Sequence, residues 1–343
     1  MNIDQKEKMM NHTPQLARRA FLSLSIGVLS SAAAGIASAQ DVYPNKPLTW
    51  VVPFAAGGPT DALARHIAER VARELGQPVV IDNSPGAGGT VGAAKVARAR
   101  NDGYTFLVGH MGYMGAAPAL YKKLSYDPVK DFEGVFRFPD TPLVLMVRPN
   151  HPAKDIAGLI DFAKQNPDKV FISNAGVGSS SHLIAALVAS SAGVKVTMVP
   201  YKGAGPALID VIGGQIDGIF DQTNTALPQI TEGKVRPLAV TSRVRLPQLK
   251  GVPTLSESIL PGFEASTWYG IYAPKGTPKP ILDKVQNAYL KVMKDKAYTG
   301  KMAEQAIQML PADQYTGEAL ARHTESEVAR WRAVAARSGL TLE

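Results

Sequence analysis

Cysteine is absent from this chain of 343 residues. Its absence excludes disulfide bonds, a catalytic thiolate and cysteine-ligated zinc. It also excludes the usual lipoprotein anchor, which requires a cysteine at the cleavage site. A chain without cysteine needs no oxidative folding, so the composition is compatible with export into a periplasm.

The sequence also lacks the short motifs of common enzyme classes. No G-x-S-x-G elbow, no Walker phosphate loop and no H-E-x-x-H zinc motif occurs. Two glycine-rich turns, at 86–92 and 174–182, both fail the dinucleotide fingerprint at its third glycine. The six histidines show no metal-ligand spacing. We therefore predict no catalytic residue, no metal and no cofactor, although a triad assembled from distant residues would leave no local motif.

Basic residues outnumber acidic ones, 37 to 29, which gives a formal net charge of +8. The basic residues are scattered, without a block of five or six and without interleaved aromatic residues, so we predict no nucleic-acid partner. A mild positive field would still attract small anions. After residue 39 no apolar stretch is long enough to span a bilayer.

Residues 1–39 are expected to form an export leader, cleaved near Ala39-Gln40. Arg18-Arg19 precede the apolar stretch AFLSLSIGVLSSAAAGIAS, which ends in a small-x-small pattern. The arginine pair resembles a twin-arginine signal, but Ala17 stands where Ser or Thr is usual. The twin-arginine and general export routes therefore both stay open, and an uncleaved amphipathic leader is the alternative. We predict a periplasmic protein.

Apolar runs typical of strands alternate with helical patterns along the remaining chain. Several runs are nearly continuous, which is typical of parallel strands buried on both faces. The order predicts an α/β fold with two doubly wound sheets. The expected strands are LTWVVPF, PVVIDN, TFLVGH, LVLMVRP, VFIS, VTMVPY, IDGIFD, RPLAVT and WYGIYAP, and the expected helices are 62–75, 89–100, 156–165, 183–192, 206–212 and most of 280–336.

Two of these segments are expected to cross between lobes. Residues 141–152 are interpreted as a strand that leaves the first lobe, and 263–274 as a strand that returns. We therefore predict a discontinuous first lobe of 40–141 plus 265–343, and a second lobe of 142–264. Two crossing strands form a hinge, and the cleft between lobes is where a small ligand binds.

The first candidate binding loop is PFAAGGPTD (53–61), between an apolar strand and the first helix. A glycine-rich turn before a helix directs backbone N–H groups and the positive end of the helix at one spot, which favours an anion. Thr60 or Asp61 could cap the helix, and Gly76 could end it. If Asp61 faces the cleft instead, it would receive a ligand ammonium group. The candidates are Phe54, Ala55, Ala56, Gly57, Gly58, Thr60 and Asp61.

The second candidate loop is NAGVGSSSH (174–182), which repeats the plan about 120 residues later. Its glycines allow unusual backbone angles, and its serines either donate to an anion or cap the following helix. A neutral His182 could donate one N–H, or pack in the core. The candidates are Asn174, Gly176, Gly178, Ser179, Ser180 and His182. Together the loops predict one negatively charged ligand held from two sides.

With these residues in hand, the chain resembles the Bug family, the periplasmic receptors of tripartite tricarboxylate transporters. Eight collinear landmarks carry the resemblance: YPNKPLTWVVPFAAGGPTD, NSPGAGGTVGAAKVARARNDGYTFLVGH, SYDPVKDFEGV, FISNAGVGSSSHL, VPYKGAGPALIDVIGGQIDGIFDQ, GKVRPLAVTS, VPTLSES and PGFEASTWYGIYAPKGTP. The resemblance implies a two-lobed type II periplasmic binding fold that closes on a small di-, tri- or aromatic carboxylate. It adds Tyr201, Gly203, Asp221 and Gln222 as cleft residues.

Two segments depart from the family pattern. Ala55-Ala56 stand where relatives often have two prolines, so they offer one or two further N–H donors. The segment GHMGYMGAAPAL (109–120) contributes His110 as a candidate, and its methionines and Tyr113 could form an apolar wall for an aromatic or alkyl ligand or simply fill the core.

The resemblance implies a monomeric receptor that binds a carboxylate and docks on a membrane permease of the tripartite type. Two other functions stay open. The same receptor could dock on a signalling protein as a ligand-sensing accessory, or the chain could be an exported α/β enzyme.

Overall fold

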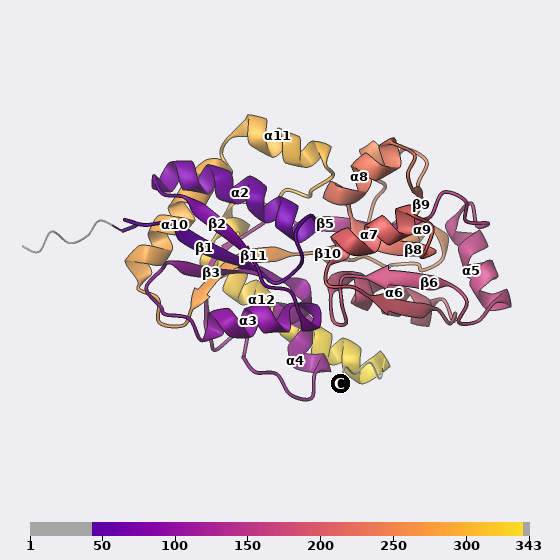
Figure 1. Ribbon diagram of the computed structural model, residues 1–343, viewed down its shortest axis with the longest axis horizontal. Helices are drawn as coiled ribbons and strands as arrows, with labels where there is room; N and C mark the ends of the chain where they lie inside the picture. Colours follow the sequence, from indigo (N-terminus) through magenta and orange to yellow (C-terminus); the bar gives the residue numbers. More distant parts are fainter. Residues whose placement is uncertain (1–42, 339–343) are drawn as a thin grey trace, which may run out of the picture. The chain divides into compact units, whose positions relative to one another are not determined.

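The computed structural model describes residues 43–338. The expected leader and its cleavage point lie outside the described residues. Within residues 43–338, no helix combines the length and apolar character needed to cross a membrane. The strands form two sheets, flanked by helices (Figure 1).

The first sheet has five strands in the order β2-β1-β3-β11-β4. Its strands β1, β2 and β3 are parallel, and β11 pairs antiparallel with both β3 and β4. Trp50, Phe136 and Tyr289 pack around its apolar interior, where the last two rings stack. The strands are β1 (Leu48–Val52), β2 (Val79–Asn83), β3 (Thr105–His110), β4 (Phe132–Arg137) and β11 (Tyr269–Pro274).

The second sheet has six strands, in the order β10-β5-β8-β6-β7 with β9 paired to β5. β6 runs parallel to β7 and β8, whereas β5 runs antiparallel to β8, β9 and β10. The strands are β5 (Thr141–Val147), β6 (Phe171–Asn174), β7 (Thr197–Pro200), β8 (Gly218–Gln222), β9 (Arg236–Val240) and β10 (Ser266–Thr267).

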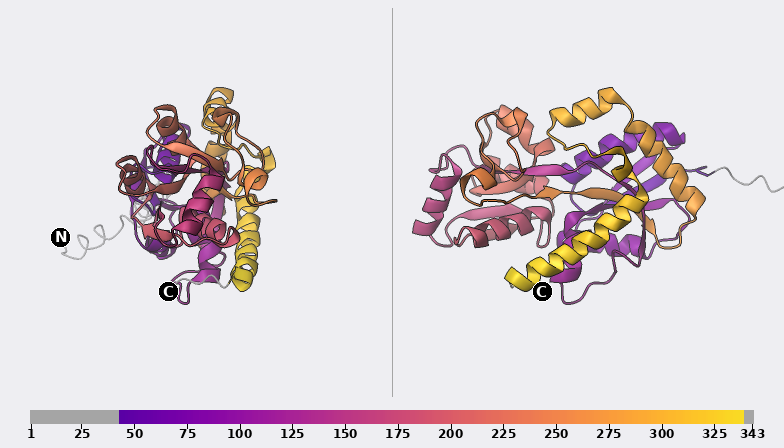
Figure 2. Two further views of the ribbon diagram at one scale, coloured as in Figure 1. Left: turned by 90° about the vertical axis from the view of Figure 1, so that its right-hand side faces the viewer. Right: turned by 180° about the vertical axis from the view of Figure 1, so that it is seen from behind.

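Helices cover both sheets. On the first lobe α2 packs against α10, and α12 packs on β4 and η4, on the side opposite to that seen in Figure 1 (Figure 2). On the second lobe α6 and α7 pack on β6 and β8. The helices are α2 (Pro59–Leu75), η3 (Ala87–Gly89), α3 (Thr90–Ala97), η4 (Met111–Ala116), α4 (Ala117–Leu120), α5 (Ile156–Gln165), α6 (Ser180–Ser191), α7 (Ala204–Ile212), α8 (Thr223–Thr231), η5 (Pro247–Leu249), α9 (Leu255–Ser258), α10 (Lys279–Val292), α11 (Lys296–Glu304), η6 (Ala312–Tyr315) and α12 (Gly317–Ser338).

The first helix shows how the sequence pattern produces local structure. Leu63, Ile67 and Val71 lie one turn apart on one face of α2, and all three are buried. The helix ends at Gly76, whose φ of 68° places it in the left-handed region that favours glycine. Its N-cap is Gly58, without a side-chain cap, so the expectation that Thr60 or Asp61 caps the helix was wrong.

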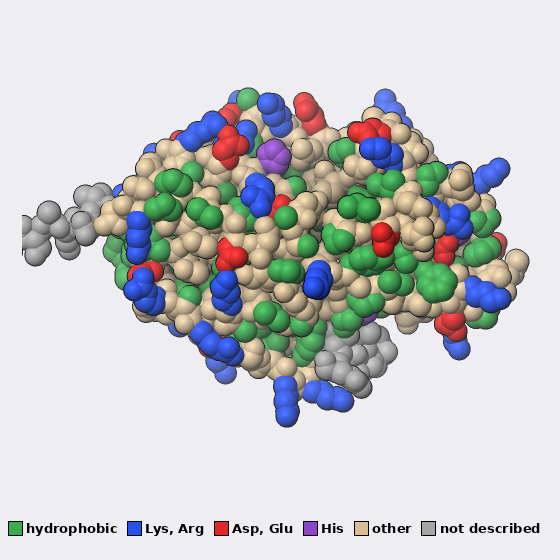
Figure 3. Space-filling view, viewed as in Figure 1, with side chains coloured by type: hydrophobic (Ala, Val, Ile, Leu, Met, Phe, Trp, Pro, Cys, Tyr) green, Lys and Arg blue, Asp and Glu red, His purple; other side chains and the backbone are tan. Residues whose placement is uncertain are grey.

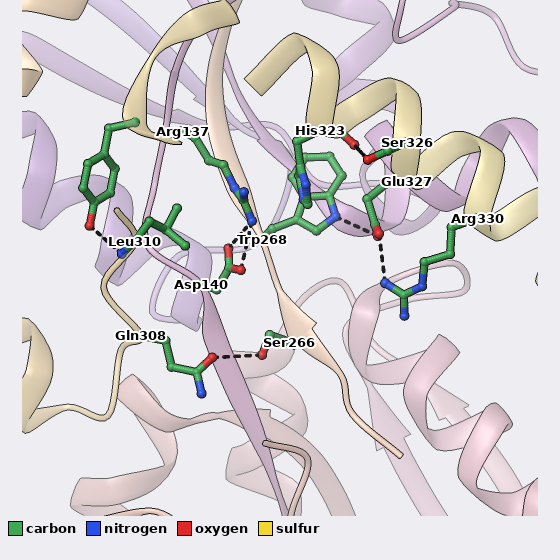
Figure 4. A network of polar contacts seen from close by, with 11 residues as sticks. Arg137, Asp140, Ser266, Trp268, Gln308, Leu310, His323, Ser326, Glu327 and Arg330 are labelled. Atoms are coloured by element: carbon green, nitrogen blue, oxygen red, sulfur yellow. Dashed lines mark hydrogen bonds and ion pairs between the residues drawn. The ribbon is translucent and has the colours of Figure 1, made fainter. Parts of the chain in front are cut away.

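The chain crosses between the sheets twice, from β4 to β5 and from β10 to β11, and these crossings form the two-strand hinge. Hydrogen bonds order the first crossing and tie the second to α12 (Figure 4). Arg137 donates to both carboxylate oxygens of Asp140 at 2.8 and 2.9 Å, and the indole of Trp268 donates to Glu327 of α12 at 3.1 Å. The fold is therefore a two-lobed α/β fold. The lobe boundaries themselves stay a prediction.

The structure corrects two expectations about the elements and decides between two alternatives. The runs LVLMVRP, RPLAVT and WYGIYAP are buried but pair antiparallel, because two of them belong to the crossing segments. The strand β4 and the π-helical turn η4 were not among the expected elements. Tyr113, Met111 and Met114 of η4 are buried in the first lobe, so the methionines fill the core instead of forming a wall of the cleft.

Candidate functional site

Four helices begin at one cavity between the lobes. The N-terminal residues or N-caps of α2, α6, α7 and α8 line it, and in this closed form its volume is only about 10 Å³, room for roughly one water molecule. Because the first N–H groups of a helix have no partner within it, the cavity gathers donors and positive dipole ends. Its lining is Phe54, Gly58, Pro59, Thr60, His110, Ala175, Ser179, Ser180, Ser181, Ala204, Asp221 and Gln222.

The first loop (53–61) presents mainly backbone to the second lobe. The N–H of Ala55 donates to the carbonyl of Lys202 at 3.0 Å, so this donor is taken by the other lobe and is not offered to a ligand. Gly57 has a φ of 81°, and both Gly57 and Ala56 are exposed. The hydroxyl of Thr60 is buried and lies 3.4 Å from that of Tyr269.

Asp61 is held by its own lobe. Arg65 donates to both of its oxygens at 3.0 Å, and the N–H of Gly57 and the amide of Asn83 donate at 3.0 Å. Burial by itself would raise the pKa of Asp61. The hydrogen bonds to its carboxylate have the larger effect, so the pKa lies below its ordinary value of 3.8. The carboxylate therefore orders the first loop, and its oxygens are already occupied by partners from the first lobe.

The second loop (174–182) relies on side chains. Ser179 caps α6, accepting from the N–H of His182 at 3.3 Å, and its hydroxyl lies 3.1 Å from that of Ser181. The buried side chain of Asn174 accepts from the N–H of Gly176 at 3.0 Å. Gly176 and Gly178 have φ of 116° and 84°, as the sequence indicated.

Ser180 joins the two lobes at the cavity. The N–H of Gly112 donates to Nδ1 of His110 at 2.9 Å, and Nε2 of His110 lies 3.0 Å from the hydroxyl of Ser180. Burial lowers the pKa of His110 to about 3, so the ring is neutral and its proton sits on Nε2. Thr267 donates to the same hydroxyl at 3.0 Å. Since the oxygen of Ser180 accepts from two partners, its own proton is left to donate.

Phe54 contributes an apolar edge beside this group. Its ring lies edge-on to that of His110, with 5.2 Å between centroids, and is 5% exposed. His182 is half-buried, and its Nδ1 accepts from the N–H of Gly178 at 3.3 Å. Burial lowers the pKa of His182. The neutral ring therefore keeps its proton on Nε2, as a donor.

Tyr201 and Gly203 lie beside the first loop. The hydroxyl of Tyr201 donates to Asp210, and burial together with that carboxylate raises the pKa of Tyr201 to about 12. Gly203 packs closely on Ala55. A Cβ added to Gly203 would lie 3.1 Å from the backbone nitrogen of Ala55. Gly203 therefore matters as a contact between lobes.

Asp221 and Gln222 end β8 at the cavity, and both are buried. Oδ2 of Asp221 accepts from the hydroxyl of Thr225 at 2.7 Å, while Oδ1 has no hydrogen-bond partner within the described residues. Burial raises the pKa of Asp221 to about 6, although Thr225 and the N–H of Gln222 lower it. The hydroxyl of Tyr269 donates to Oε1 of Gln222, which leaves the amide N–H groups as donors.

A third glycine turn completes the cleft and was missed as a site from the sequence. Residues 86–89 line a groove of about 490 Å³ together with Phe54, Ala175–Val177 and Pro200–Lys202. A Cβ added to Gly88 would lie 2.0 Å from the carbonyl oxygen of Val177. The signal was present in the sequence, because GAGG also follows a strand and precedes a helix.

The cleft is closed in this structure. Besides the bond from Ala55 to Lys202, the hydroxyl of Tyr121 donates to the carbonyl of Val177 at 3.0 Å. The amide of Asn224 donates to the carbonyl of Pro59 at 3.1 Å. Both loops and the third turn therefore meet the opposite lobe directly.

No lysine or arginine is among the residues that line the inner cavity, and within residues 43–338 no group of three His, Asp or Glu side chains could hold a metal ion. A larger hollow of about 580 Å³ lies between 118–130 and α12. Its charged side chains, such as Lys130, Glu325 and Arg332, are exposed, so water screens them. It is a weaker candidate for binding an anion.

Comparisons with known proteins agree with this geometry. A family model described as the tripartite tricarboxylate transporter family receptor matches residues 63–340. The structure of the periplasmic binding protein BugD is 40% identical, with a TM-score of 0.84, and the match covers 88% of this chain and 100% of that one. MatC from Rhodopseudomonas palustris with bound malate is 38% identical, with a TM-score of 0.82 and coverage of 85% and 99%.

A protein of R. palustris with adipate is 36% identical, with a TM-score of 0.82, and the match covers 87% of this chain and 99% of that one. The family model spans both lobes, and the solved relatives named as binding proteins share the two-lobed fold. The chain therefore belongs to the tripartite tricarboxylate transporter receptor family, together with the Bug-type periplasmic solute-binding proteins.

Proposed function

We propose that this protein captures a small carboxylate in the cleft between its lobes and delivers it to a membrane permease of the tripartite type. The observation that carries the proposal is the cavity where α2, α6, α7 and α8 begin. It offers backbone N–H groups and buried neutral donors, which suit a carboxylate. The malate and adipate in the related structures support the same ligand class.

The first and second loops act as the two walls of the binding site in this proposal. The proposed ligand contacts are the free N–H groups at the starts of α2 and α6, the hydroxyl of Ser180 and the amide of Gln222. Ala55, Asp61, Asn174 and Tyr201 shape the loops through contacts within the protein. A neutral donor set holds an anion less tightly than an arginine clamp, which suits release to a permease.

Closure couples binding to delivery. A ligand that contacts both loops stabilises the closed form, because only that form brings both sets of donors together. The permease then distinguishes the liganded receptor by its closed surface. Lysines and arginines are dispersed over the face seen in Figure 3, and a single basic patch typical of nucleic-acid binding is not seen there. We propose a monomeric, non-catalytic, periplasmic receptor.

A thermal-shift screen of the purified protein tests this function. The ligands are dicarboxylates, tricarboxylates, aromatic carboxylates and acidic amino acids, with the matching amides as uncharged controls. A ligand present at 100 times its Kd stabilises the fold by about 2.7 kcal/mol, so a true ligand gives a clear rise in Tm. A rise with an acid and none with its amide is expected. The proposal fails if no acid raises Tm, or if a bound acid is converted to product.

A double variant tests the loops themselves. Gly57→Pro together with Ser179→Ala alters the first loop and removes the cap of α6, so carboxylate affinity is expected to fall at least tenfold. Gly233→Pro with Ser190→Ala serves as the matched control, because Gly233 also has positive φ (70°) and both positions lie away from the cavity. Equal affinity in the two double variants would contradict the proposed walls.

A further inference from the structure

Asp221 is the acidic side chain of the cavity, and one of its carboxylate oxygens receives no hydrogen bond within the described residues. It is 1% exposed, lines the cavity, and lies at the end of β8. Thr225 fixes its Oδ2, but its Oδ1 has no partner within the described residues. A buried carboxylate oxygen without a donor is costly, so such an atom indicates a partner supplied by something that binds there.

The protein itself offers Asp221 no cation. Among residues 43–338 no ion pair involves it, whereas Asp61 at the opposite wall is paired with Arg65. The sequence pattern leaves two roles open for Asp61, a helix cap or, if it faces the cleft, the acceptor for a ligand ammonium group. Its oxygens are occupied by Arg65, Gly57 and Asn83, so the acceptor role belongs to Asp221.

The neighbours of Asp221 in the cavity are donors. Ser180 accepts from His110 and Thr267 and keeps its own proton to donate, and Gln222 keeps its amide N–H groups. A carboxylate therefore satisfies the donors but not Asp221. An unsubstituted carboxylate would also bring a second negative charge close to Asp221 with no proton between them, which is unfavourable in a buried site.

We propose that the ligand carries a hydroxyl or ammonium group next to its carboxylate, and that Oδ1 of Asp221 accepts a hydrogen bond from that group. This inference rests on the proposed function and narrows its ligand class. Ser180 and Asp221 line the same narrow cavity, and for this reason the proposal places the donor group on the carbon adjacent to the carboxylate. Thr225 is the positioning residue, since its bond to Oδ2 leaves Oδ1 for the ligand.

Matched pairs of acids that differ at one carbon test the inference. Titration calorimetry at pH 7.5 compares malate and aspartate with succinate, 2-hydroxyglutarate and glutamate with glutarate, and mandelate with phenylacetate. A hydrogen bond to a charged group makes the substituted acid bind about 10- to 100-fold more tightly in the size class that fits. Comparing the hydroxy acids with the amino acids shows whether the group that donates to Asp221 is a hydroxyl or an ammonium.

Variants assign the effect to one side chain. Asp221→Ala is expected to reduce the ratio between substituted and unsubstituted acid to about one. Asp221→Asn keeps an acceptor oxygen, so it should retain part of a hydroxyl preference and lose an ammonium preference. Asp217→Asn is the matched control: Asp217 lies just before β8, at the end opposite Asp221, and pairs with Arg148. It should keep the wild-type ratio.

The outcomes separate the two proposals. Acids that bind without discrimination, or an unchanged ratio in Asp221→Ala, overturn this inference and leave the proposed function standing. If no acid of either kind binds the wild-type protein, the proposed function fails and the inference fails with it. Circular dichroism and Tm of each variant show whether it folds, and Asp221→Asn keeps the test decisive if Asp221→Ala does not.

Discussion

The two walls of the cleft follow one plan but use different atoms. Both are glycine-rich turns between a strand and a helix, and both helices point their N-termini at the cavity. The wall from the first lobe is made of backbone: α2 has Gly58 as its N-cap, without a side-chain bond. The wall from the second lobe is made of hydroxyls, with Ser179 as the cap of α6 and Ser180 and Ser181 beside it.

Because the two walls use different atoms, we expect them to have different roles in binding. Glycines of the first lobe approach the second lobe closely, as Gly58 of the first wall does at Gly205 and Gly88 of the third turn does at Val177, so the first lobe sets how far the cleft closes. The serines are ordered by partners outside their own loop, as Ser180 is by His110 and Thr267, so this wall orients donors. Changes to the first wall should alter affinity for every ligand alike, and changes to the second should depend on the ligand.

Gly88→Ala is expected to have the largest effect. Its Cβ would lie 2.0 Å from the carbonyl oxygen of Val177 in the other lobe, so the variant holds the cleft open. We expect at least a roughly 100-fold loss of affinity for every acid, because the closed form becomes rare. Calorimetry measures the affinity, and small-angle scattering with ligand present detects the missing closure.

The control for this variant is Gly76→Ala. Gly76 has a φ of 68°, close to the 61° of Gly88, but an added Cβ there meets nothing within 4 Å. Both variants therefore strain the backbone to a similar degree, and only one creates a clash between lobes. Similar losses of affinity in the two would show that strain, and not closure, is responsible.

The sequence predicts much of this arrangement, for physical reasons that can be traced. The strand–glycine–helix order is local, so both loops, the end of α2 at Gly76 and the bounds of α5 could be predicted from it. Pairing direction is not local: WYGIYAP looks like a buried parallel strand because burial, not direction, determines its composition. Partners of buried polar atoms depend on tertiary placement, so the occupation of Asp61 and the free oxygen of Asp221 could not be predicted.

Ser180→Ala tests the hydroxyl wall and should have the second-largest effect. It removes a donor that His110 and Thr267 orient, and a hydrogen bond to a carboxylate contributes about 1.5–3 kcal/mol, or about 10- to 100-fold in affinity. Ser190→Ala, an exposed position on the same helix, is the control and should bind like the wild type. Unchanged calorimetric affinity in Ser180→Ala would mean that the hydroxyl serves only to join the lobes.

Asp221→Asn should change the pH dependence of stability without ligand. Burial raises the pKa of Asp221 from 3.8 to about 6, so the folded protein binds the proton more tightly than the unfolded chain. The ionised carboxylate therefore destabilises the wild type progressively as the pH rises from about 4 to 6. The variant should gain about 1–3 kcal/mol above pH 6 and nothing below pH 4.

Thermal unfolding of both proteins from pH 4 to 8 measures this difference. His110 has a lowered pKa, so it makes the folded state less stable as the pH falls. This effect is the same in the wild type and the variant, and it cancels in the difference between their Tm values. A difference in Tm that does not vary with pH would contradict the raised pKa of Asp221.

Ala55→Pro is expected to have the smallest effect and sharpens the comparison most. Proline removes the N–H that donates to the carbonyl of Lys202 at 3.0 Å, a neutral bond between lobes that contributes about 1 kcal/mol. The closed form becomes less populated, so affinity should fall about fivefold by the same factor for every acid in a calorimetric series. A loss confined to some acids would instead mean that this N–H contacts the ligand, and the backbone wall would then take part in recognition as the serines do.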